Sequence, residues 1–134
     1  MKAAVDLRIA HADEIVAAAK QTLVDGSPMN RPMWWVDPTD PQTFTISDRK
    51  SCFFRQGMNR VTGTAIIKFA EFMLGDNLLV APVVQEGAVS RDVYLPRGTW
   101  QAETTAGQTN FTGPMWLRNW PAPLNVLPFF RRVP

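Results

Sequence analysis

The chain has 134 residues, of which 46% are hydrophobic and 19% are charged, and this composition excludes a disordered chain. The formal net charge of +2 is too small to indicate binding to nucleic acid or to a membrane surface. The lone Cys52 cannot form an internal disulfide, and no apolar run is long enough to predict a membrane-spanning segment or a signal peptide.

A helical period occurs near the amino terminus. Apolar residues recur there at spacings of three and four, at Ile9, Ala12, Val16, Ala19 and Leu23. This spacing predicts a helix over residues 7–24. Gly26 suits the left-handed position after a helix, and Pro28 prevents continuation. The apolar stripe has no second helix in this sequence to pack on, so we expect its partner to lie in a larger neighbour.

The rest of the chain predicts short strands and turns, because its eleven prolines are unsuited to helix interiors and central strands. Strands are expected at 33–36, 44–46, 72–74, 77–84, 91–95, from 99 and at 124–130. Turns are expected at 37–41, 75–76 and 96–98, with a loop over 103–110. Residues 91–95 alternate polar and apolar, which predicts a half-buried strand. Regular turn signals indicate an antiparallel β-sandwich or barrel, so the chain is expected to be mainly β.

No catalytic or metal-binding constellation is evident. His11 is the only histidine, and no serine or cysteine lies at a spacing that indicates a catalytic triad with it. We therefore expect His11 to face solvent on the helix. One histidine and one cysteine supply no metal-ligand cluster, and no cofactor motif is present, so neither a metal nor a cofactor is predicted.

Three aspartates and three tryptophans invite functional interpretations. Asp37 and Asp40 could act as paired carboxylates on a glycoside, but DPTDP (37–41) is typical of a turn, and Asp76 in GDN also fits a turn. The tryptophans could stack on sugars, but their apolar surroundings favour a place in the core; they are Trp34, Trp35 and Trp100. We expect no exposed aromatic cluster.

Two further stretches carry weak signals. Residues 49–70 contain basic and aromatic side chains without an acid, but no matching basic face elsewhere supports nucleic-acid binding. Asn110 begins the triplet Asn-Phe-Thr in a predicted loop, which is an N-glycosylation acceptor pattern and the one candidate modification site. It is weak support for a parent protein in the secretory lumen, a lysosome or the extracellular space, and the compartment itself is undetermined.

Several stretches together resemble glycoside hydrolase family 31. They are GSPMNRPMWW (26–35), FMLGDNLLVAPV (72–83), RDVYLP (91–96), GTW (98–100), PL (123–124) and PFFR (128–131). The Trp-Trp pair and the early end after Arg131 resemble most the myogenesis-regulating glycosidase branch. The order and spacing match over most of the chain apart from 49–70.

This resemblance implies that the chain is a C-terminal fragment of an α-glycosidase. Residues 1–27 would be the terminal helix of a missing (β/α)₈ catalytic barrel, and residues 28–134 would form the β-sandwich domain packed behind it. GDNLLVAPVV (75–84) would be a sandwich strand. Family 31 enzymes carry their nucleophile and acid/base aspartates on barrel loops, and no acidic residue here matches either motif. The parent would therefore hydrolyse α-linked carbohydrate, its specificity set by barrel loops, whereas this chain alone would have no catalytic residue.

Residues 49–70 interrupt the family pattern and can be explained as a retained intron. The codons CGT AAG TCN for Arg49, Lys50 and Ser51 contain a splice donor, and TTT GCA GAA for Phe69, Ala70 and Glu71 contains an acceptor. Splicing would join Asp48 through a glutamine to Phe72 in the same frame. The alternative is a genuine loop insertion, which costs little entropy at a surface. Any other codon for Arg49 would contradict the intron hypothesis.

Two other functional hypotheses stay open. The chain could be a free-standing noncatalytic β-sandwich module that binds carbohydrate or a protein partner, although the unpartnered helix argues against it. It could also be an expressed but poorly soluble product, because losing several hundred Å² of apolar burial at roughly 25 cal/mol per Å² removes most of a typical stability margin.

Overall fold

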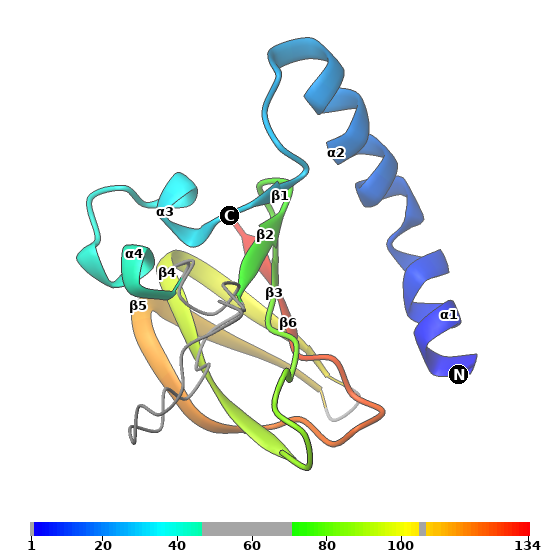
Figure 1. The fold of residues 1–134 in the computed structure, drawn as a ribbon, viewed down its shortest axis with the longest axis vertical. Helices are drawn as coiled ribbons and strands as arrows, with labels where there is room; N and C mark the ends of the chain where they lie inside the picture. Colours follow the sequence, from blue (N-terminus) through cyan, green and yellow to red (C-terminus); the bar gives the residue numbers. More distant parts are fainter. Residues whose placement is uncertain (1, 47–70, 105–106) are drawn as a thin grey trace, which may run out of the picture.

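A computed structural model describes residues 2–46, 71–104 and 107–134 (Figure 1). The proposed intron at 49–70, and Cys52 within it, lie outside these residues. The described chain forms two amino-terminal helices, two short helices and one antiparallel sheet. The prediction of a mainly β, antiparallel fold is thereby confirmed.

The predicted helix over 7–24 begins earlier and is interrupted once. α1 spans Lys2–Ala10 and α2 spans Ala12–Asp25, with His11 between them at φ −106° and ψ 13°. Backbone hydrogen bonds continue across the interruption, from His11 N–H to the Leu7 carbonyl at 3.2 Å and from Ile15 N–H to the His11 carbonyl at 3.0 Å. Gly26 ends α2 in the left-handed conformation, φ 73°, as predicted.

Six strands form the sheet in the order β1-β2-β3-β6-β4-β5. Their bounds are β1 Asn30–Arg31, β2 Phe72–Leu74, β3 Leu78–Val80, β4 Ser90–Thr104, β5 Gly107–Pro121 and β6 Phe129–Val133. β2 and β3 meet at the predicted Gly75 turn, where φ is 62°. The carboxyl-terminal strand begins later than the predicted 124–130, because Leu124 and its neighbours form an exposed turn first.

The long β4–β5 hairpin differs most from expectation. Pro96, Arg97 and Gly98 do not end a strand; β4 runs through them with an irregularity in pairing between Leu95 and Gly98. Gly98 has φ +131°, a conformation that side chains rarely adopt. The turn signal therefore marks a bend within one strand. In Figure 1 the hairpin curls around as a yellow and orange ribbon.

Two segments predicted as strands are helical. α3 spans Met33–Val36 and α4 spans Pro41–Ile46. Pro41 occupies a first helical position, where proline is favoured, and the Asp40 carboxylate accepts the Gln42 N–H at 2.9 Å. The Asp-Pro pair was therefore a helix-start signal that strand propensity obscured.

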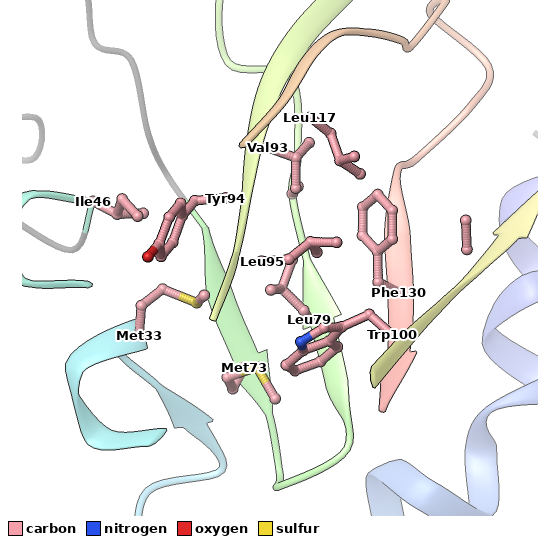
Figure 2. Packing of buried hydrophobic residues seen from close by; sticks show 12 residues of the cluster. Met33, Ile46, Met73, Leu79, Val93, Tyr94, Leu95, Trp100, Leu117 and Phe130 are labelled. Atoms are coloured by element: carbon pink, nitrogen blue, oxygen red, sulfur yellow. The ribbon is translucent and has the colours of Figure 1, made fainter. Parts of the chain in front are cut away.

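The core lies where the curved sheet closes over itself. Trp100, Phe130 and Leu79 have no exposed surface, and Figure 2 shows them facing Leu95 and Met73. The prediction that Trp100 is a core residue is confirmed.

A second part of the core lies on the other face of β4. Tyr94 is buried there beside Met33 of α3 and Ile46 of α4 (Figure 2). The half-buried strand predicted at 91–95 is therefore wrong at its centre, because the two short helices cover the face that alternation assigned to solvent.

Candidate functional site

His11 fastens the amino-terminal helices to the sheet. It is buried rather than solvent-facing, so that prediction was wrong. Its Nδ1 lies 2.9 Å from Glu14 Oε2, and its ring meets Phe129 edge-on with centroids 5.1 Å apart. Arg131 of β6 donates to the other Glu14 oxygen. Although burial opposes it, these hydrogen bonds from His11 and Arg131 lower the pKa of Glu14.

The apolar stripe predicted on the helix is on the opposite, open side. Exposed fractions are 68% for Ile9, 50% for Val16 and 87% for Leu23, whereas His11 and Ala18 face inward. Figure 1 shows α1 and α2 as a blue rod standing at the side of the sheet. The expectation that the stripe lacks a partner within this sequence therefore holds for the described residues.

A buried ion pair joins β2 to β4. Arg91 Nη2 lies 2.9 Å from Glu71 Oε1, and the Tyr94 N–H lies 3.2 Å from both carboxylate oxygens. The Glu71 side chain has no exposed surface. Burial raises the pKa of Glu71 to about 7, although Arg91 and the Tyr94 N–H oppose the rise. Burial also lowers the pKa of Arg91.

Sequence reasoning missed this ion pair because nothing in the spacing joins its members. Glu71 and Arg91 are twenty residues apart, and Glu71 lies at the edge of the segment that interrupts the family pattern. Only the pairing of the strands brings them together. The pair ties elements of the fold and does not face an open site.

Asp37 and Asp40 hold a turn, as the composition predicted. Asp37 Oδ1 accepts the Thr39 hydroxyl at 2.7 Å, and Asp40 caps α4 as described above. The Tyr94 hydroxyl donates to Asp40 Oδ2. Burial, assisted by the Asp40 carboxylate, raises the pKa of Tyr94 well above its ordinary value. Both carboxylates are thus committed to the fold rather than arranged for glycoside chemistry.

Asp76 is likewise structural. It lies in the predicted turn between β2 and β3 and accepts a hydrogen bond from Arg31 of β1. Arg31 also donates to the Ser27 hydroxyl at 2.9 Å, and Ser27 donates to Asp25 at the end of α2. Hydrogen bonds from Ser27, and then from Gln21, lower the pKa of Asp25 to about 2. This chain of contacts links the end of α2 to the sheet.

An exposed aromatic cluster, which we call the aromatic patch, lies on α3 and α4. It consists of Trp34, Trp35 and Phe44, which are 38%, 46% and 49% exposed. Trp34 stacks on Phe44 with ring centroids 6.2 Å apart and planes 9° from parallel. The predictions that both tryptophans lie in the core and that no exposed cluster exists were wrong. Helical geometry turns Met33 inward and leaves its two neighbours outside.

The glycosylation candidate lies in a strand rather than a loop. Asn110 is in β5, exposed, with its amide oxygen accepting from Gln101 Nε2 at 3.2 Å. The loop expected over 103–110 is mostly strand, since β4 and β5 pair from Ser90 to Thr104.

Within the described residues no three His, Cys, Asp or Glu side chains gather as metal ligands, and no helix there is long and apolar enough to cross a membrane. The contacts given above assign their carboxylates to caps, turns and ion pairs. The open features are two apolar surfaces, the helix stripe and the aromatic patch.

Comparison with known proteins identifies the same segment in larger proteins. Residues 26–133 match the glycosyl hydrolase family 31 C-terminal domain. The chain is 37% identical over 107 residues to the SITS-binding protein of Tetronarce californica, covering 80% of this chain and 12% of that protein. It is 31% identical over 105 residues to the mouse myogenesis-regulating glycosidase, covering 78% and 11%.

Solved structures agree with the sequence relatives. A family 31 α-xylosidase from a soil metagenome superposes with a TM-score of 0.76 at 27% identity, covering 98% of this chain and 16% of that one. A family 31 dextranase of Flavobacterium johnsoniae gives 0.67 at 30% identity, covering 88% and 12%. The chain therefore spans about an eighth of the length of the curated relatives named above.

Proposed function

Because this chain belongs to glycosyl hydrolase family 31, as its C-terminal domain, we propose that it is the noncatalytic supporting domain of an α-glycosidase. The observation that carries this proposal is the pairing of that match with an apolar helix stripe that nothing in the described chain covers. In the proposal, a catalytic (β/α)₈ barrel elsewhere in the parent protein covers the stripe and hydrolyses α-linked carbohydrate.

The proposed division of the chain follows from the same features. Residues 1–27 would belong to the barrel as its terminal helix, and residues 28–134 would form the β domain behind it, with 49–70 an intron-derived insertion. The start of the family match at residue 26 supports a boundary near the end of α2. The contacts of His11, Glu14 and Arg131 would then hold the barrel's last helix against the β domain.

Catalytic residues are absent from this chain in the proposal. The aspartates at 37, 40 and 76 hold turns, and Glu71 is buried in an ion pair. A retaining glycosidase needs two carboxyl groups about 5–5.5 Å apart beside an open sugar site. The site of the parent would lie at the carboxyl ends of barrel strands, which this sequence does not contain.

Hydrolysis assays on the purified chain test this assignment. We expect no turnover of nitrophenyl α-glucoside, α-xyloside or α-galactoside above a buffer control. Turnover that copurifies with the chain, and that is lost on replacing Asp37 and Asp40 by asparagine, would overturn the proposal.

The aromatic patch favours a second candidate, a carbohydrate-binding module. Stacked, half-exposed tryptophans present flat apolar faces with a polar edge, which suits sugar rings as well as protein partners. The two candidates differ in a glycan-binding assay on the isolated chain. A supporting domain predicts no binding of α-glucans, whereas a binding module predicts binding that Trp34→Ala and Trp35→Ala abolish and that the buried-strand control Leu117→Val retains.

A further inference from the structure

The Asn-Phe-Thr triplet at 110–112 is presented by the fold in a form that a glycan can occupy. Asn110 and Thr112 are both exposed on β5. Phe111 between them turns inward, with ring centroids 5.7 Å from Trp120 and 6.5 Å from Phe130. Alternation along the strand therefore places the acceptor amide and the threonine hydroxyl on the same outward side.

The position of β5 in the sheet gives the acceptor a free edge. β5 pairs with β4 alone and ends the strand order, so in the described sheet its other side has no neighbouring strand. Long edge strands expose unpaired backbone groups and invite pairing with other chains. Proline, which lacks the N–H, blocks such pairing where it occurs.

The two halves of this edge are protected differently. The second half of β5 contains Pro114 and Pro121. The first half, residues 107–113, contains no proline and no charged side chain, and Asn110 lies at its centre. A bulky, solvated glycan at that asparagine would block the unprotected half.

We propose that Asn110 is an N-glycosylation site and that its glycan caps the open first half of the β5 edge. The neighbouring strand supports this placement. Asn110 pairs with Gln101 on β4, which pairs with Arg131 on β6, where Glu14 of α2 makes contact. The helix is therefore two strands away from Asn110, and the glycan leaves the sheet beside the helix. This proposal does not depend on the proposed function.

Expression of the full chain behind a cleavable secretory leader tests the site. A carboxyl-terminal tag with its own acceptor triplet reports delivery into the lumen, and only chains with a glycosylated tag are scored. Asn110 begins the single Asn-X-Ser/Thr triplet of the sequence, so its use adds one further mobility shift that peptide N-glycosidase F removes.

We expect the additional shift in the unchanged chain, in Thr112→Ser, which keeps the acceptor, and in the control Asn125→Gln, an exposed asparagine outside any triplet. We expect its loss in Asn110→Gln and in Thr112→Ala. Tag glycosylation alone in the unchanged chain would overturn the assignment of the site. An equal aggregated fraction for Asn110→Gln and Thr112→Ser in light scattering would overturn the edge-capping role.

Discussion

Replacing Glu71 by glutamine should change how the stability of the domain depends on pH. Glu71 is fully buried, and its carboxylate faces Arg91 and the Tyr94 N–H. Glutamine keeps an oxygen that can accept both hydrogen bonds but carries no charge. Arg91 also donates to the carbonyls of Pro82 and Asp92, so it keeps partners in the variant.

The size of the effect follows from the pKa of Glu71. Burial raises it from 4.5 to about 7 in the folded chain. Between these values the folded state holds a proton that the unfolded state has released, so stability falls as pH rises. Each pH unit corresponds to about 1.4 kcal/mol, which gives a loss on the order of 3 kcal/mol between pH 4.5 and 7. In Glu71→Gln this loss should disappear.

Urea unfolding followed by tryptophan fluorescence, at low protein concentration and at several pH values from 4.5 to 8, measures the effect. The matched control is Glu86→Gln, because Glu86 is exposed and should leave the pH dependence unchanged. If Glu71→Gln shows the same decline in stability as the unchanged chain, Glu71 does not hold the proton and the reasoning fails. The comparison also bears on the proposed intron, since splicing would place glutamine at this position.

Three further changes test the packing described above. Gly113→Ala should disrupt the β4–β5 hairpin, because the added Cβ would lie 2.0 Å from a backbone carbonyl oxygen, whereas Gly87→Ala meets no atom within 4 Å and should cost only the roughly 1–2 kcal/mol of its left-handed backbone; urea midpoints that match would contradict this. Phe130→Ala should lower the free energy of unfolding by about 3–5 kcal/mol, compared with under 1 kcal/mol for the exposed Val89→Ala, and an equal effect would place the core elsewhere. Leu23→Lys on the open stripe should reduce the aggregated fraction of the isolated chain, and unchanged light scattering would show that the stripe is not what limits solubility.

Local signals in the sequence predicted the parts of the fold that short-range chemistry decides. Gly26 ends α2 and Gly75 turns the chain between β2 and β3 because each needs a positive φ that glycine adopts freely. The turn role of Asp37 and Asp40 follows from side chains that bond nearby groups. These features require no knowledge of distant neighbours.

The errors arose where distant neighbours decide. Trp34 and Trp35 were expected in a buried strand, but packing of Met33 against Tyr94 favours a helical turn that leaves them outside. His11 was expected to face solvent, and the sheet residues Phe129 and Arg131, more than a hundred positions away, supply its surroundings. The Glu71–Arg91 pair could not be predicted because strand pairing alone brings the two side chains together.

Long-read cDNA sequencing across the locus, starting well upstream of Met1, tests the central claim most directly. The account predicts a transcript that encodes a barrel with two catalytic aspartates upstream of this chain and joins Asp48 through glutamine to Phe72. A transcript that begins at Met1 and keeps residues 49–70 would contradict it, and the aromatic patch would then become the feature to test for carbohydrate binding.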